Sequence, residues 1–198
     1  EHKRIIFNGN NYSEQWVREA EKRGLSNLKN TVEALPAFVA QKSIDVFTRH
    51  NVLTETEIRS RYEILLENYC KTLRIEALTM VDMVKKEIIP ACISYQNELL
   101  QLLRGKKSCG DYDFCLEQHY LERISKLSAC LLKNLDALEN AVLKTKDESD
   151  ALTQAGFYRD HVLGAMSELR LVVDELETIV PKKYWPLPTY SEMLYSVY

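Results

Sequence analysis

Apolar residues recur at helical spacing over the stretch from residue 54 to residue 103. From Ile58 to Leu102 the stripe covers 44 residues in 12 steps, a mean of about 3.67 residues per step, close to the 3.6 residues per turn of an α-helix. Its members are Ile58, Tyr62, Leu65, Tyr69, Leu73, Ala77, Met80, Val84, Ile88, Ala91, Tyr95, Leu99 and Leu102. The stripe predicts a long helix, roughly 75 Å if unbroken, that packs nearly straight.

The start of this helix and one irregularity within it also show in the sequence. Thr54-Glu55-Thr56-Glu57 is the pattern of a capping box, so we expect the helix to begin near Thr54. Pro90 lies inside the stripe; it has no N–H to donate and its ring crowds the carbonyl of Lys86, which predicts a kink. Two helices in tandem are the alternative, but no turn residues flank Pro90.

Two further helical stripes follow, over about 114–144 and about 149–180. The first consists of Leu116, Tyr120, Ile124, Leu127, Leu131, Leu135, Leu138 and Val142. The second consists of Leu152, Tyr158, Val162, Met166, Leu169, Val173, Leu176 and Val180. The segment 104–113 is rich in glycine and charge, which predicts a loop between antiparallel helices. Asp147 to Asp150 forms a second polar junction with an acidic helix start.

Short helices are expected ahead of residue 54. Ser13 is a plausible N-cap for a helix from Glu14 to Arg23, with Gly24 following its end and with Trp16 and Val17 as its buried side. Two short pieces follow over 25–50; Pro36 suits a first helical turn but not a helix interior. Asn51 stands where a left-handed backbone conformation is wanted.

The last eighteen residues differ from the rest. Pro181 should stop the third long helix, and the stretch Trp185-Pro186-Leu187-Pro188 should be extended. Residues 191–198 are compatible with one last helical turn. Because the tail is too apolar for a free terminus, it docks either on this chain or on another chain or domain. Its candidate docking residues are Trp185, Pro186, Leu187, Pro188 and Tyr190.

These patterns predict an all-α fold. Its centre is an antiparallel bundle of three long helices, about 54–103, 114–144 and 149–180, with the first kinked near Pro90. Short helices over 14–50 precede the bundle and the tail 181–198 follows it. No alternating strand pattern is present.

Composition narrows the class of protein. The 198 residues are 45% hydrophobic and 28% charged with a net charge of −3, which fits a globular protein and gives no electrostatic pull toward nucleic acid or membrane. No apolar run is long enough for a transmembrane helix, and no signal peptide is recognised. Five cysteines without a CxxC motif favour reduced thiols and a cytoplasmic location. Because the chain begins with Glu1, we expect a fragment or a processed product.

Catalytic and metal-binding patterns are missing from the sequence. A di-iron bundle needs Glu-x-x-His pairs, and none of the four histidines has a glutamate three residues earlier. Cys115 and His119 share a helical face at a spacing of four, but a thiol beside a surface imidazole is a simpler interpretation than a metal site. We therefore predict no catalytic, cofactor-binding or metal residues.

Several stretches together resemble the C-terminal region of type III glutamine synthetases, in the same order and spacing. They are residues 3–13 (KRIIFNGNNYS), 16–25 (WVREAEKRGL), 47–54 (FTRHNVLT), 60–66 (SRYEILL) and 184–190 (YWPLPTY). Asn11 and Asn51 stand where the family is expected to have glycine. The resemblance covers essentially the whole chain.

The resemblance implies a domain of a larger enzyme. The family joins ammonia to glutamate with ATP and divalent metal, and works as a ring-based homo-oligomer. Since its catalytic motifs lie upstream, residues 1–13 would be the exit from an absent catalytic domain and 14–198 a non-catalytic helical domain that supports subunit or oligomer structure. Its partners would be its own catalytic domain and other subunits, without nucleic acid or membrane. A helical module that recruits a regulatory protein is the alternative.

Overall fold

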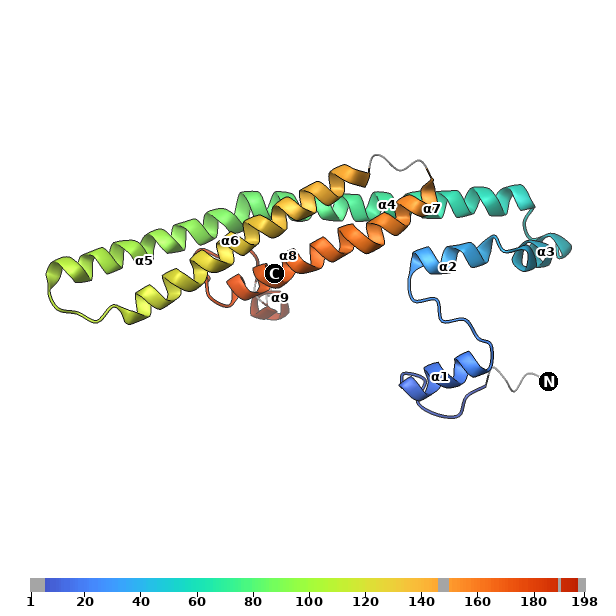
Figure 1. The fold of residues 1–198 in the computed structure, drawn as a ribbon, viewed down its shortest axis with the longest axis horizontal. Coiled ribbons are helices and arrows are strands. Elements are labelled where there is room, and N and C mark those ends of the chain that lie inside the picture. The colour runs from blue at the N-terminus through green and yellow to red at the C-terminus, as the bar shows by residue number, and fades with distance from the viewer. Residues whose placement is uncertain (1–5, 146–149, 189, 196–198) are drawn as a thin grey trace. The chain divides into compact units, whose positions relative to one another are not determined.

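The computed structural model describes residues 6–145, 150–188 and 190–195, apart from the side chains of Tyr190 and Ser191. Every regular element in this part of the chain is helical (Figure 1), which confirms the all-α class. The chain divides into two compact units, Glu1–Tyr69 and Cys70–Tyr198. Among the described helices, none combines the length and the apolar character that a membrane span requires.

The first helix of the N-terminal unit is α1 (Glu14–Lys22). It begins as predicted, with the Ser13 hydroxyl accepting the N–H of Trp16 at 3.4 Å, and Gly24 follows it at φ +72°. The predicted buried side is wrong in part, because Val17 is 46% exposed. None of the nine residues of α1 is buried. Trp16 is covered by a nearby residue, Phe7, on which it stacks with ring centroids 4.6 Å apart.

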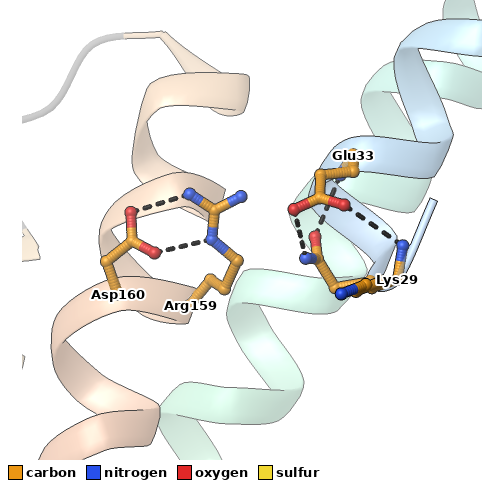
Figure 2. Close-up of polar contacts among 5 residues, drawn as sticks. Lys29, Glu33, Arg159 and Asp160 are labelled. Atoms are coloured by element: carbon orange, nitrogen blue, oxygen red, sulfur yellow. Dashed lines mark hydrogen bonds and ion pairs between the residues drawn. The ribbon is translucent and has the colours of Figure 1, made fainter. Parts of the chain in front are cut away.

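Two short helices follow, α2 (Thr31–Phe38) and α3 (Gln41–Arg49). Asn30 caps α2 by accepting the N–H of Glu33 at 3.0 Å, and the Glu33 carboxylate accepts the N–H of Lys29 at 3.1 Å in return (Figure 2). Pro36 lies inside α2 and not in a first turn as predicted. Since α2 ends two residues later, the proline removes one helical hydrogen bond near a terminus. Asn51 has φ +53°, as predicted.

The long helix begins at the predicted capping box. In α4 (Glu55–Met83), the N–H of Thr54 donates to Glu57 Oε2 at 2.7 Å and the N–H of Glu57 donates to Thr54 Oγ1 at 3.3 Å. The boundary between the two units falls within α4.

The irregularity expected near Pro90 takes the form of a π-helical turn. This turn, η2 (Val84–Ile88), leads directly into α5 (Ile89–Cys109). The N–H of Ile89 bonds to the carbonyl of Val84, five residues back. A π-helical turn is one of the known causes of helix irregularity, and here it ends two residues before Pro90, which has no N–H to donate.

The loop after α5 is shorter than predicted. Residues 104–109, expected in the loop, belong to α5, and α6 (Cys115–Lys144) begins after residues 110–114. The ammonium of Lys106 extends across the turn to Glu117 at 2.6 Å, a long-range contact that stabilises the last helical turn. At the ends of the predicted stripes, Leu102 and Leu116 are 48% and 65% exposed, so their predicted burial is wrong.

The third predicted helix is observed in three consecutive segments, α7 (Ala151–Phe157), the π-helical turn η4 (Tyr158–Val162) and α8 (Leu163–Glu177). Asp150 caps α7 by accepting the N–H of Thr153 at 2.8 Å. Arg159 and Asp160 in η4 form a two-bond ion pair of 2.6 and 2.8 Å (Figure 2). The rest of the predicted polar junction, 147–149, lies outside the described residues.

The core of the second unit lies along α6, which packs against both α5 and α8 (Figure 1). Its fully buried side chains include Ile88, Ile124, Leu131, Leu135, Leu138, Val162, Leu169 and Leu176. Two ion pairs connect the helices at the surface, Lys85–Glu139 at 2.5 Å and Arg123–Glu175 at 2.9 Å. The complete antiparallel three-helix bundle over 54–180 stays a prediction.

Candidate functional site

The tail after α8 folds back on the helices of the second unit. The carbonyl of Pro181 accepts the N–H groups of Tyr184 and Trp185, at 2.9 and 3.1 Å, and this turn directs both rings toward the protein. Trp185 is only 4% exposed, and its indole N–H donates to Glu177 Oε1 at 3.0 Å. A buried indole with its polar atom satisfied is a stable anchor.

A second contact of the tail is centred on Glu98 of α5. Its carboxylate accepts hydrogen bonds from the Lys183 ammonium and from the Tyr184 hydroxyl. The Tyr184 ring lies 6.0 Å from the Tyr95 ring, centroid to centroid. Glu98 and Glu177, together with Lys183, Tyr184 and Trp185, are called the tail anchor below.

The charges of the tail anchor favour the docked state. Hydrogen bonds from Lys183 and then Tyr184 lower the pKa of Glu98. The Glu98 carboxylate accepts a hydrogen bond from the Lys183 ammonium and another from the Tyr184 hydroxyl, and these bonds raise the pKa of both groups. The anchor is therefore built for an ionised Glu98 between a protonated lysine and a protonated tyrosine.

The other predicted docking residues lie beside the anchor. Pro186 and Pro188 are exposed and Leu187 is half-buried, while the Leu187 carbonyl accepts a hydrogen bond from the Lys182 ammonium at 3.2 Å. Tyr190 begins the short helix α9 (Tyr190–Tyr195), and its side chain lies outside the described part of the chain.

A groove of about 670 Å³ lies next to the tail. Leu187 and Pro188 line one side of it, Met193 of α9 contributes as well, and the remaining lining comes from α4, η2 and α8. The lining is mostly apolar, with polar groups from Glu76, Thr79, Arg170, Asp174 and Glu177.

The sequence pointed to the tail but not to its partners. Glu98 and Glu177 sit on helix surfaces among many other acidic residues, and no spacing marks either as the receptor of a segment 85 or 8 residues away. The one signal in the sequence was the apolar Trp-Pro-Leu-Pro run, because such a run is too apolar for a free chain end.

The turn between α5 and α6 holds a charge pair whose carboxylate is nearly buried. Glu117 is 5% exposed, and Lys106 donates both to its carboxylate at 2.6 Å and to the Asp113 carbonyl at 3.0 Å. The hydrogen bond from Lys106 lowers the pKa of Glu117. This pair closes the turn between the helices.

Cys115 and His119, which the sequence places on one helical face, contact different neighbours. The Cys115 thiol is exposed and hydrogen-bonds to Asp113, which raises the thiol pKa, while His119 meets the edge of Tyr120 at 5.8 Å. The described part of the chain contains no group of three His, Cys, Asp or Glu side chains that could hold a metal ion. These donors do not fit the divalent metal that the resemblance implies for the parent enzyme.

Comparisons with known proteins all point to the glutamine synthetase family. The profile described as "Glutamine synthetase C-terminal domain" matches residues 1–107. A glutamine synthetase of Butyrivibrio fibrisolvens is 45% identical over 99% of this chain, and a type-3 glutamine synthetase of Dictyostelium discoideum is 36% identical over 98% of it. A glutamine synthetase of Bacteroides fragilis is 31% identical over 97% of the chain.

The matches cover only part of each relative. The chain spans 28% of the length of the Butyrivibrio protein and 27% of each of the other two. A family profile that matches more than half of the chain, with relatives similar over nearly all of it, confirms the resemblance carried by the quoted stretches. The chain belongs to the glutamine synthetase C-terminal domain family.

Proposed function

We propose that this chain is a non-catalytic structural domain of a type III glutamine synthetase. In the parent enzyme, ammonia is ligated to glutamate at the expense of ATP, with a divalent metal, in the cytoplasm. Residues 14–198 form the helical domain, with the three predicted long helices as an antiparallel bundle, and residues 1–13 lead from the catalytic domain. The domain stabilises the subunit or its homo-oligomer.

The observation that supports this proposal is that several ion pairs and hydrogen bonds connect one helix to another. Lys85–Glu139, Lys106–Glu117 and Arg123–Glu175 connect helices to each other, and the tail anchor connects the chain end to α5 and α8. Catalytic groups converge on a substrate cavity. Here the ion pairs between different helices and the hydrogen bonds of the tail anchor join elements, which suits a scaffold.

The activity claim is tested on the 198-residue chain. An assay of glutamine formation from glutamate, ammonia and ATP should read zero for this chain, and the full-length protein serves as the positive control. Clear ligase activity of the 198-residue chain would overturn the non-catalytic role.

The scaffold claim is tested on the parent enzyme. We expect removal of residues 14–198 from the full-length protein to change its particle mass in light scattering or to lower its thermal stability. An enzyme lacking this region that assembles and melts as the complete protein does would contradict the scaffold role.

A further inference from the structure

The groove beside the tail has an unusual lining. Of the four methionines in the chain, three line this one groove, namely Met80, Met83 and Met193. Methionine is flexible and polarisable, and clusters of it are typical of surfaces that adapt to helices of varied sequence. The lining also includes the aliphatic residues Val84, Ile88, Val173 and Leu187.

The groove is open to a partner. Ile75 lines it and is 66% exposed, and Met193 is 55% exposed. Its lining comes from the end of α4, from η2 and α8, and from the tail and α9. An apolar channel between helices is a common receptor for the apolar face of another helix.

The charged residues in the lining of the groove are mainly acidic. Glu76 stands on α4, and Asp174 and Glu177 stand on α8. The basic residue in the lining, Arg170, forms an ion pair with Asp174 at 3.3 Å. Carboxylates on both helices therefore favour an occupant that carries positive charge along both edges of an apolar stripe.

We infer that this groove binds an amphipathic helix of a protein partner, with an apolar stripe flanked by lysine or arginine. The apolar stripe lies on the methionines and the aliphatic lining residues, and the basic edges face Glu76 of α4 and Glu177 of α8. This interaction goes beyond the scaffold role, which does not depend on it.

The test uses the full-length protein and a fluorescent 18-residue helical peptide of leucine and lysine. Its twin carries glutamate in place of every lysine. We expect the lysine peptide to bind at least ten-fold more tightly than the twin in fluorescence anisotropy, and binding to weaken as salt is raised. Equal affinity for the two peptides, or no binding of either, would overturn the inference.

Two matched variants locate the binding. Ile75→Lys places a positive charge in the groove, whereas Ile93→Lys places the same charge on α5, where Ile93 is 60% exposed and outside the groove. We expect the first to weaken lysine-peptide binding at least ten-fold and the second to change it less than two-fold. Equal effects of the two variants would place the peptide elsewhere and contradict the inference.

A third variant and one further measurement close the remaining alternatives. Glu76→Gln, at an exposed position, should reduce the preference for the lysine peptide over the glutamate peptide without loss of helical content in circular dichroism. An unchanged preference would show that the acidic lining residues do not select the basic peptide and would contradict the inference. If light scattering shows self-association that Ile75→Lys abolishes, the occupant is a second copy of the chain and the inference is wrong.

Discussion

Glu98 is the residue on which the docking of the tail depends most. It is an ordinary surface glutamate of α5 by sequence, yet it accepts hydrogen bonds from both Lys183 and Tyr184. Because both donors come from one short segment, loss of this carboxylate removes two contacts together. The indole contact of Trp185 with Glu177 remains as the second attachment.

The first prediction concerns acid release of the tail. The folded-state pKa of Glu98 is lowered from about 4.5, so its contribution to docking is present above pH 4.5 and is lost as the pH falls through the lower folded value. In a Trp16→Phe background, where Trp185 is the remaining tryptophan, we expect its emission to shift to the red as the pH falls below 4.5 and through that lowered pKa.

The control for that experiment is Glu98→Gln, which keeps the side-chain shape but not the charge. We expect this variant to show a red-shifted or more easily quenched Trp185 already at pH 7, with a flatter acid response. Identical pH profiles for Glu98→Gln and its background would show that Glu98 does not hold the tail.

The second prediction compares two neighbouring leucines of α6. Leu131 is 1% exposed and Leu132 is 55% exposed. We expect Leu131→Ala to lower the free energy of unfolding by about 2–5 kcal/mol, because it leaves a cavity in a packed core, and Leu132→Ala to change it by less than about 0.5 kcal/mol. Urea denaturation measures both, and similar losses would contradict the core assignment.

At the scale of helices, the sequence predicted the capped starts closely, whereas the end of α5 was predicted too early. Ser13, Thr54 and Asp150 mark helix starts through local hydrogen bonds, and such contacts are encoded within three or four residues. The end of α5 was misplaced by six residues because Lys106 is stabilised by Glu117, eleven positions away. Partners across a turn do not follow helical periodicity, so no local pattern could reveal them.

The third prediction tests the capping box. Thr54→Ala removes the hydroxyl that accepts the N–H of Glu57 at 3.3 Å, and we expect it to destabilise the chain by about 1 kcal/mol. Thr56→Ala, in the first turn of the same helix and also exposed, is the matched control and should be neutral within about 0.5 kcal/mol. Equal losses from the two changes would mean that Thr54 does not cap α4.

At the scale of the whole molecule, no pattern in the sequence indicated a division into two units. The apolar stripe passes through the boundary at Tyr69–Cys70 without interruption, since helical spacing reports on one element and not on which elements share a core. The tail is a second example of a feature that helical spacing does not report. Its apolar character predicted docking, but Glu98 and Glu177 can be identified as its hydrogen-bond acceptors only when the positions of the helices are known.

The fourth prediction follows from the unequal cores. Among the described residues of the first unit, the buried hydrophobic side chains are Val32, Ile44, Ile58 and Leu66, whereas the second unit contains the great majority. Local stability follows buried apolar contacts. Hydrogen exchange on the 198-residue chain should therefore be slowest for amides of α5, α6 and α8 and much faster for α1 to α3; uniform protection would contradict it.

The π-helical turn η2 has a consequence for how this helix tolerates length changes. Twelve turns of a regular α-helix take about 43 residues, so the 44-residue stripe from Ile58 to Leu102 carries about one residue too many, and η2 accommodates it. Deleting a single codon within 84–88 should thus convert η2 to ordinary α-helix with little rotation of α5. The same deletion in α6 would rotate every later side chain of that helix by about 100°. Such a deletion should therefore be tolerated at η2 and rejected in α6, which a deletion scan read out by soluble expression would show.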